Sequence, residues 1–466
     1  MEKGRVLFLY SNSEGYGGVP NGIALLSACL KQAGFETKCF DTTFIKSPPV
    51  DHFQRQKYEG VKDSDVSEVW GKWYPGLEKK IPELFLKTIK EFNPDLMATS
   101  FTEVNFIYGV SLLKPLKKKF AVPVIAGGIF PTLSPEIVID NDAIDMVCIG
   151  EGEDALVELA LAIVEKRDYS HIKNLWVKKD GEIIKNTLQN LRSLDSLPYQ
   201  DWSIFDQKHF YKPYCGGFPK MAYIELTRGC PYNCTYCTQG NMRDLLKGKG
   251  SYLRKRSIDN ALNEACWMKL EWDIDIIFFT DDNFLGMDSE RFDYFCNQYE
   301  KKVGIPFWIQ TRCESIREDY IKRLKEVNIS TLTMGIEHGD EEYRRKYMNR
   351  KTSNKVIQEA FEIVHNYDIR TTVNVMIGLP YETEALCKST LRLIKQIQPR
   401  SITMSFYLPY RGTEMFEMSV RGGYILADNV IDNSNICLNM PQFPRERIMY
   451  YFNNYRRFID GELPID

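Results

Sequence analysis

Long apolar runs, a secretory leader and an excess of one charge are all missing from this sequence. No segment approaches the roughly eighteen consecutive apolar residues that a membrane-spanning helix requires. The first residues, Met-Glu-Lys-Gly-Arg, run directly into a strand-like segment, so no leader is expected and the protein is predicted to be cytoplasmic. A formal net charge of −3, without a stripe of lysine or arginine, argues against nonspecific binding of nucleic acid.

The sequence also has few histidines, and few of its cysteines lie close together. The chain has five histidines and twelve cysteines; three of the cysteines share one run and the others stand singly. Scattered cysteines are typical of buried thiols in a reducing cytoplasm and not of a disulfide framework. The hydrophobic content of 44% predicts a globular protein, and 466 residues are too many for one ordinary core, so two or three domains are expected.

The one run of cysteines is Cys230, Cys234 and Cys237, at C-x3-C-x2-C spacing. It directly follows a strand-like segment at 222–227. Three neighbouring thiolates can hold three irons of a cubane iron–sulfur cluster and leave the fourth iron open for chemistry. Two alternatives are a set of buried core cysteines and a zinc site. A zinc site normally needs a fourth protein ligand, and the twenty residues after the run hold no histidine or cysteine.

Short apolar segments alternate with helical patterns in the first third of the chain. The expected strands are 5–10, 36–41, 95–100, 122–126 and 145–149, and the expected helices are 21–33 and 105–119. Such alternation predicts an α/β fold with a doubly wound, Rossmann-like parallel sheet, which binds ligands at the carboxyl ends of its strands. Small and glycine residues gather at those ends, where they let a ligand approach the backbone: Ser100, Thr102, Gly127, Gly128, Thr132, Gly150, Glu151 and Gly152.

The alternation restarts after a proline-broken stretch. We expect a first domain at 1–165 with an insertion at about 46–85, a linker at 166–215 with a small hairpin at Asp180-Gly181, a second domain at 216–410 and a helical cap at 411–466. Expected strands of the second domain are 222–227, 274–280, 306–311, 331–336, 371–377 and 401–406. Six parallel strands with intervening helices predict a partial, TIM-like (β/α)6 barrel with its chemistry at the strand carboxyl ends.

The first domain resembles the cobalamin-binding domain that precedes many radical S-adenosylmethionine (SAM) enzymes. The matching segments are 19–27, 127–132 (Gly-Gly-Ile-Phe-Pro-Thr) and 150–153 (Gly-Glu-Gly-Glu). The resemblance implies that the glycine-rich strand ends hold cobalamin (vitamin B12). The sequence lacks the Asp-x-His-x-x-Gly motif of other cobalamin domains, so a histidine is not expected as the lower ligand of cobalt.

Residues 1–410 together resemble the radical SAM superfamily members with an N-terminal cobalamin-binding domain. Besides the cysteine run, the matching segments are 278–284, 310–313, 334–339 and 376–380. The resemblance implies that Cys230, Cys234 and Cys237 ligate a [4Fe–4S] cluster. It further implies two contacts to the adenine of SAM, from Tyr236 and from Gly378. Asp281, Asp282 and Asn283 are expected to contact the ammonium group of SAM. Arg312 is expected to bind its carboxylate, and Glu337 to meet its ribose or methionine end.

The expected activity is reductive cleavage of SAM to a 5′-deoxyadenosyl radical, used for cobalamin-dependent methylation of an unactivated carbon. The alternative is a radical dehydration, rearrangement or cyclisation of a sugar, nucleoside or tetrapyrrole, with or without cobalamin. Candidate substrate residues follow the last strand: Tyr410 as a proton donor and Arg411 as an anion holder. Expected partners are a small-molecule substrate and an external electron donor such as flavodoxin or ferredoxin, with no nucleic acid and no membrane span.

Overall fold

The computed structural model describes residues 4–12, 20–46, 69, 74, 76–212, 214, 215, 217–425 and 436–465. The chain divides into two compact units. The first comprises Met1–Gln56, Lys62–Phe218 and Asp244–Tyr252, and the second Lys57–Val61, Pro219–Arg243 and Leu253–Asp466. The segment after the cysteine run therefore returns to the first unit before the chain continues into the second.

The first unit is built on one sheet with the strand order β2-β1-β3-β4-β5-β6-β7. Its strands are β1 (Arg5–Tyr10), β2 (Glu36–Asp41), β3 (Leu96–Ser100), β4 (Val124–Gly127), β5 (Met146–Cys148), β6 (Leu175–Lys179) and β7 (Glu182–Lys185). The first five are parallel, as expected, and the hairpin β6–β7 adds two antiparallel strands. The order 2-1-3-4-5 is the flavodoxin-like form of the doubly wound fold, and its switch point lies between β1 and β3.

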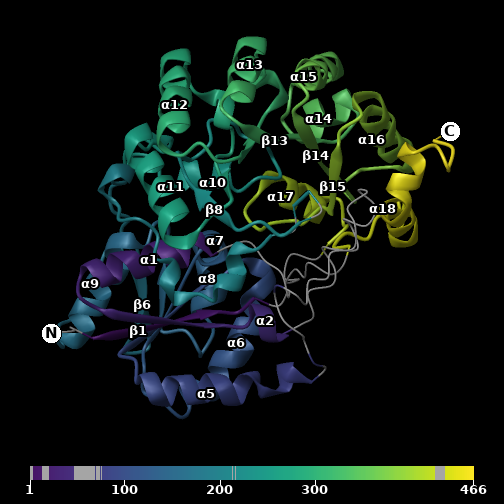
Figure 1. Ribbon diagram of the computed structural model, residues 1–466. Helices are drawn as coiled ribbons and strands as arrows, with labels where there is room; N and C mark the ends of the chain where they lie inside the picture. The colour runs from purple at the N-terminus through teal and green to yellow at the C-terminus, as the bar shows by residue number, and fades with distance from the viewer. Residues whose placement is uncertain are drawn as a thin grey trace. The chain divides into compact units, whose positions relative to one another are not determined.

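Helices cover both faces of this sheet (Figure 1). The helices α1 (Asn21–Gln32) and α9 (Glu153–Val164) pack together on one face, and α5 (Ile81–Phe92) and α6 (Glu103–Lys117) lie on the other. Shorter helices are α2 (Thr43–Lys46), α7 (Ile129–Leu133) and α8 (Pro135–Ile139), and 3₁₀ turns span Leu77–Lys80, Leu194–Ser196, Trp202–Ile204 and Gln207–Phe210. Apolar side chains of α5 and α6 and of the strands form a continuous buried core.

The expected insertion at 46–85 lies mostly outside the described residues, including Trp70 and Trp73. Its last residues begin α5, whose Ile81 and Phe85 are buried in the core. Tyr74 is exposed. Where this stretch is described, it therefore contributes a helix of the doubly wound fold.

The second unit holds a sheet of six strands in the order β15-β14-β13-β12-β11-β8, all paired in parallel. The strands are β8 (Met221–Ile224), β11 (Ile276–Phe279), β12 (Phe307–Thr311), β13 (Ile329–Glu337), β14 (Arg370–Ile377) and β15 (Ser401–Phe406). Each strand pairs with the next strand along the chain, apart from the small hairpin of β9 (Thr227–Arg228) and β10 (Arg254–Lys255). Among the described residues β8 and β15 do not pair with each other, so the sheet is the expected partial (β/α)6 barrel.

Helices form an arc outside these strands (Figure 1). They are α11 (Ile258–Trp272), α12 (Ser289–Lys302), α13 (Glu318–Glu326), α14 (Glu341–Tyr347), α15 (Asn354–Asn366) and α16 (Glu384–Ile397), with 3₁₀ turns at Phe284–Gly286 and Cys313–Ser315. The side chain before most of these helices accepts a hydrogen bond from the first turn: Ser257, Asp288, Asp340, Ser353 and Thr383. The caps Asp288, Asp340 and Thr383 begin α12, α14 and α16 soon after β11, β13 and β14 end, so these three loops at the carboxyl edge of the sheet are short.

The C-terminal region adds α17 (Glu414–Arg421) and α18 (Arg445–Ile459). Helix α18 packs on α16: the guanidinium of Arg447 donates to the Glu384 carboxylate at 2.7 and 2.8 Å, and the Tyr451 hydroxyl donates to it at 3.0 Å. Phe452 stacks on Phe406 of β15 with ring centroids 4.1 Å apart. Across the part of the chain that the structure describes, every helix is too short or too polar to cross a membrane.

Candidate iron–sulfur and cofactor sites

The three cysteines of the run lie on the loop that follows β9 at the carboxyl edge of the second unit's sheet. Cys230, Cys234 and Cys237 are all half-buried, and none forms a disulfide. Burial raises the pKa of Cys230 and raises that of Cys237 to about 12. Both are therefore thiols until a metal displaces the proton.

The donor set fits a cubane cluster better than zinc. Among the described residues no group of three or more His, Cys, Asp or Glu side chains converges on one point where a single metal ion could be bound. A structural zinc site normally takes four protein ligands, whereas a cubane cluster can be held by three thiolates. Three half-buried thiols without a fourth protein ligand fit the cluster with an open iron.

The cysteine loop is fixed from several sides. The Thr235 hydroxyl donates to the carbonyl of Tyr347 at 2.5 Å, and the Asn349 amide donates to the carbonyl of Asn233 at 2.7 Å. The Arg243 guanidinium, on α10 (Gln239–Leu245), donates to the loop carbonyls of residues 230–232 at 3.5, 3.0 and 3.3 Å. These bonds use the Thr235 side chain and backbone carbonyls of the loop, and none of them involves a cysteine sulfur.

Three candidate SAM residues at the end of β11 have different surroundings. Asp281 is fully buried and accepts from the backbone N–H of Leu226 at 3.2 Å and from the Thr227 hydroxyl. The Asn283 side-chain oxygen accepts from the Thr311 hydroxyl at 2.7 Å and from the backbone N–H of Arg312 at 3.2 Å. Both side chains therefore join neighbouring strand ends to each other.

Asp282, between these two bracing residues, remains on the exposed side. Burial by the surrounding atoms, followed by the charge of Glu225, raises the pKa of Asp282. Its charge also contributes to the raised pKa values of Cys230 and Cys237, which places the carboxylate near the cluster thiols. Of the three candidates, Asp282 is the one whose carboxylate is available for a cation.

Arg312, expected to bind the SAM carboxylate, contacts the cysteine loop directly. Its Nη1 lies 3.5 Å from the Cys234 sulfur, and its guanidinium lies 3.8 Å from the centre of the Tyr232 ring. Its Nε donates to Glu314 at 2.6 Å. A carboxylate partner is therefore already present in the protein.

Tyr236 and Glu337 meet at an arginine that sequence reasoning missed. Arg350 is almost fully buried; its Nη1 donates to the Tyr236 hydroxyl at 3.1 Å and lies 3.5 Å from a Glu337 carboxylate oxygen. Burial raises the pKa of Glu337 against the opposing effect of Arg350. Arg350 follows α14 and ends no strand, so no periodicity or spacing in the sequence marks it.

The backbone at Glu337 is strained. Its φ is +66°, in the left-handed region that non-glycine residues rarely adopt, and the pairing of β13 with β14 is irregular there. A Cβ at Gly335 would lie 2.2 Å from the Glu337 carboxylate, so glycine at 335 makes room for that side chain. Strain at a strand end with a buried ion pair is typical of a functional site.

Gly378 and the substrate candidates lie at the ends of β14 and β15. The N–H of Gly378 donates to buried Glu382 at 2.7 Å, and a Cβ at 378 would lie 3.6 Å from Ile448 of α18. Tyr410 and Arg411 are half-buried, and the next carbonyl, of Gly412, accepts from Asn241 of α10. The structure thus brings the 410–412 loop to the helix that follows the cysteine loop.

In the first unit, the candidate cobalamin residues lie along the carboxyl edge of the sheet. Gly128, with φ of +101°, must be glycine because a Cβ would lie 2.8 Å from the Phe101 carbonyl. The Thr132 hydroxyl donates to the carbonyl of Gly128 at 2.8 Å and accepts from the N–H of Gly150 at 3.1 Å. Thr132 therefore ties the ends of β4 and β5 together.

Other members of that set also have structural roles. Thr102 caps α6 in a capping box with Asn105. The carbonyl of Glu151 accepts from the Asn174 amide at 2.7 Å. Ser100 is half-buried, and Gly127, Gly150 and Gly152 present backbone without side chains. An edge with several glycines at strand ends fits a large ligand that approaches the backbone closely.

A buried polar pair at the end of β2 was not expected from the sequence. The Nε2 atom of His209 contacts the Asp41 carboxylate, and among the described residues its Nδ1 has no hydrogen-bond partner. Nearby, burial lowers the pKa of Lys212 to about 7. No local pattern pairs residues separated by 168 positions, so the fold alone brings this histidine to the sheet edge.

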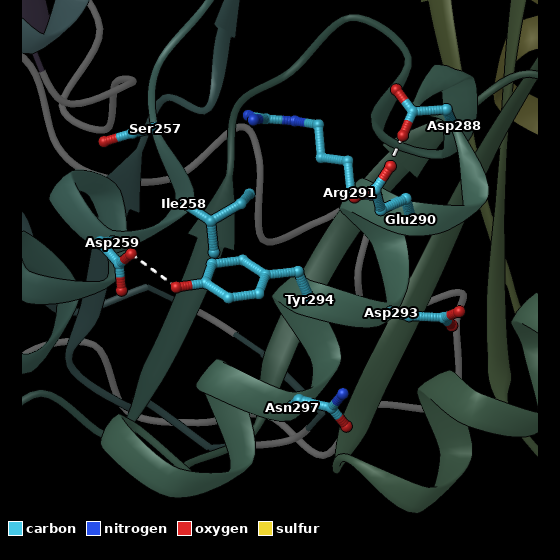
Figure 2. A pocket seen from close by; sticks show the side chains of 9 residues that line it. All are labelled: Ser257, Ile258, Asp259, Asp288, Glu290, Arg291, Asp293, Tyr294 and Asn297. Carbon is cyan, nitrogen blue, oxygen red and sulfur yellow. Dashed lines mark hydrogen bonds between the residues drawn. The ribbon is translucent and has the colours of Figure 1, made fainter.

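A surface hollow of about 690 Å³ lies between the N-terminal ends of α11 and α12 (Figure 2). Its lining includes four acidic residues, Asp259, Asp288, Glu290 and Asp293, beside Arg291. Figure 2 shows Tyr294 pointing toward Asp259, whose carboxylate accepts from the hydroxyl at 2.6 Å. None of the candidate site residues lines this hollow.

Two family models match this chain. The Radical SAM superfamily matches residues 224–394, which include the cysteine run and β11 to α16. The B12 binding domain matches residues 74–160, which include β3 to β5 and the glycine edge.

Known proteins resemble the chain over most of its length. It is 24% identical to an uncharacterised methyltransferase of Pyrococcus horikoshii, over 74% of this chain and 73% of the relative. It is 23% identical to the cytidylyl-2-hydroxyethylphosphonate methyltransferase of Streptomyces wedmorensis, over 87% and 78%. It is 24% identical to the anaerobic magnesium-protoporphyrin IX monomethyl ester cyclase of Cereibacter sphaeroides, over 72% of this chain and 55% of the relative.

Among solved structures, the radical SAM methyltransferase TsrM of Kitasatospora setae, with cobalamin and a [4Fe–4S] cluster bound, has a TM-score of 0.65. The match has 16% identity and covers 92% of this chain and 80% of that one. The cobalamin-dependent radical enzyme OxsB has a TM-score of 0.62 at 14% identity, over 98% and 56%. These matches show a shared fold, and the two family models mark a radical SAM domain at residues 224–394 and a B12-binding domain at residues 74–160.

Proposed function

We propose that this protein is a cobalamin-dependent radical SAM methyltransferase that methylates an unactivated carbon of a small molecule. The observation that carries the proposal is the cysteine loop: three half-buried thiols, on a loop anchored by hydrogen bonds to neighbouring segments, at the carboxyl edge of a (β/α)6 sheet. When bound, the cluster supplies the electron that cleaves the sulfonium bond of SAM, and cobalamin carries the methyl group. The radical SAM and B12-binding matches and the methyltransferase relatives support the same activity.

The chain's own residues bind and orient SAM in this proposal. Cys230, Cys234 and Cys237 hold the cluster. Asp282 attracts the SAM ammonium because its carboxylate is available near the thiols. Tyr236 lies beside the adenine, with its hydroxyl fixed by Arg350.

Other residues complete the SAM site. Glu337, fixed by the same arginine and by its strained backbone, meets the ribose or methionine end. Gly378 contributes backbone atoms. Asp281 and Asn283 act indirectly, since their side chains hold the ends of β8, β11 and β12 in register.

Tyr410 and Arg411 are proposed to contact the substrate, as a proton donor and as an anion holder. Their loop is tied to the cysteine loop because the backbone N–H of Met415 donates to the carbonyl of Thr235 at 2.9 Å. In the first unit, cobalamin is proposed to bind along Ser100, Thr102, Gly127, Gly128, Thr132, Gly150, Glu151 and Gly152. An external reductant such as flavodoxin or ferredoxin supplies the electron.

The magnesium-protoporphyrin cyclase relatives favour a second candidate. In it the same radical step leads to cyclisation, dehydration or rearrangement. Both candidates generate 5′-deoxyadenosine from SAM, so that product alone does not separate them. Methyl transfer also consumes a second SAM and releases S-adenosylhomocysteine.

The test begins with the visible spectrum of protein produced with hydroxocobalamin, purified anaerobically and desalted. We expect cluster absorption together with near-stoichiometric cobalamin. With SAM and a strong reductant we then expect both 5′-deoxyadenosine and S-adenosylhomocysteine by chromatography. The matched control replaces Cys230, Cys234 and Cys237 with alanine and forms no 5′-deoxyadenosine. A cluster without retained cobalamin contradicts the methyltransferase and leaves the second candidate.

A further inference from the structure

We propose that Arg312 is a positioning residue for the iron–sulfur cluster, through a hydrogen bond to the Cys234 sulfur that sets the reduction potential of the cluster. The inference rests on the proposed function, because it assumes that the cysteine loop holds the cluster. It replaces the role expected from the sequence, in which Arg312 pairs with the carboxylate of SAM.

The first observation is the direction of the guanidinium. Its Nη1 lies 3.5 Å from the sulfur of Cys234, within hydrogen-bond distance for sulfur. Its plane is also held against the ring of Tyr232, at 3.8 Å from the ring centre. Two residues of the cysteine loop thus contact one guanidinium that comes from the end of β12.

The second observation is that one edge of the guanidinium is already used. Nε and Nη2 both bind one oxygen of Glu314, at 2.6 and 2.5 Å. This is the edge with which arginine binds carboxylates in a fork. With Glu314 on that edge, Nη1 is directed at the sulfur.

The third observation is that this partner is itself fixed. The other oxygen of Glu314 accepts from the Thr352 hydroxyl at 3.0 Å, and the backbone N–H of Arg312 donates to Asn283. Only 9% of the Arg312 side chain is exposed. An arginine guanidinium stays protonated in proteins, so the group is cationic.

A cationic donor at a cluster thiolate has a defined effect. Reduction adds negative charge to the cluster, and hydrogen bonds to its sulfurs are among the factors that set its potential. The N–H of Arg312 stabilises the reduced cluster more than the oxidised one. Loss of that bond therefore shifts the potential to more negative values and makes the electron harder to supply.

The experiment is a reductive titration followed by EPR on full-length protein, reconstituted anaerobically with iron and sulfide, without SAM, cobalamin or substrate. We expect Arg312→Gln to shift the midpoint potential to more negative values and Arg312→Lys to shift it less, because lysine keeps the charge but loses the fork to Glu314. The matched control is Arg317→Gln, an exposed arginine paired with Asp319, which leaves the potential unchanged.

A second readout separates the two roles of Arg312. The affinity for SAM, measured by equilibrium dialysis on the same proteins, is expected to stay within about twofold of the wild type. An unchanged potential with SAM binding weakened tenfold or more overturns the proposal and restores the carboxylate role. Arg312→Gln could fold normally, with an apo form that unfolds at the wild-type temperature, and still assemble no cluster. In that case the Arg312→Lys variant decides: a midpoint potential more negative than that of the wild type supports the proposal, and any other result overturns it.

The result also distinguishes this inference from the proposed function. A wild-type protein that assembles no [4Fe–4S] cluster overturns both. A cluster whose potential responds to Arg312, in a protein that transfers no methyl group, overturns the methyltransferase and leaves this inference standing.

Discussion

At the end of β11, two of three consecutive polar residues make structural hydrogen bonds, and the third is available to a ligand. Asp281 and Asn283 accept hydrogen bonds from the neighbouring strand ends, and Asp282 between them keeps its carboxylate available. Asp281 follows β11 and the next two residues form a turn, so the three side chains have different neighbours. A ligand contact from Asp282 therefore depends on two neighbours that do not touch the ligand.

Asp281 predicts a pH dependence of stability. Burial raises the pKa of this carboxyl from 3.8 to about 7, against the hydrogen bonds of Thr227 and Leu226 that lower it. Between these values the folded state binds a proton that the unfolded state has released, so the stability from this group is lost as the pH rises toward and through 7. From pH 6 to pH 8 we expect a loss of about 1 kcal/mol.

The Asp281→Asn variant tests this expectation, since an amide oxygen still accepts from the Leu226 N–H and carries no charge. Denaturant unfolding at the two pH values should show a smaller loss of unfolding free energy in the variant than in the wild type. Equal losses in the two proteins would mean that Asp281 does not titrate in this range.

At the scale of elements, short connections fix the carboxyl edge of the second unit. The segment 347–350 at the end of α14 holds the cysteine loop through the Tyr347 carbonyl and the Asn349 side-chain amide, and it places Arg350 between Tyr236 and Glu337. A helix that ends near the cysteine loop thus also positions the expected SAM residues. The first turn of α17 also contacts the cysteine loop, through the backbone N–H of Met415.

Gly339, at the start of the β13–α14 connection, tests this packing. A Cβ there would lie 2.3 Å from the Cα of Thr390 in α16, and a helix backbone cannot move aside as a flexible side chain can. We expect Gly339→Ala to lower the unfolding free energy by about 3 kcal/mol. The measurement is denaturant unfolding of the apo protein.

The matched control is Gly22→Ala in α1. A Cβ at that exposed position meets nothing within 4 Å, so the change should be neutral or stabilising by up to ~1 kcal/mol. If both variants unfold at the same denaturant concentration, the close packing of Gly339 on α16 does not contribute to stability.

At the scale of the whole molecule, the two expected cofactors belong to different units. The cluster cysteines lie in the second unit, and the glycine edge lies in the first, on a sheet with its own core. Each unit folds around its own sheet, so the sites can be tested separately. No cysteine of the run contributes to the core of the first unit.

We therefore expect the triple Cys230/Cys234/Cys237→Ala variant to lose cluster absorption and to retain cobalamin at wild-type stoichiometry. Visible spectra of the desalted variant and wild type measure both quantities. Loss of cobalamin with an unchanged far-UV circular dichroism spectrum would show that cobalamin binding requires the cluster.

The sequence alone determined the strand–helix alternation of both units and the position of the cysteine run. These features are local: hydrophobic periodicity reports the burial of neighbouring residues, and three cysteines within eight positions need only one loop to bring them together. For the same reason the strand ends were found, and with them most of the candidate residues.

Only the tertiary structure decided which of those residues are available. Contacts between distant segments give Asp281 and Asn283 their hydrogen-bond partners on neighbouring strand ends. Such contacts also pair Arg312 with Cys234, and they place Arg350 beside Tyr236 and His209 beside Asp41. A side chain's type shows what it can bind, but its partner is set by the packing of strands and helices, and that packing has no local pattern in the sequence.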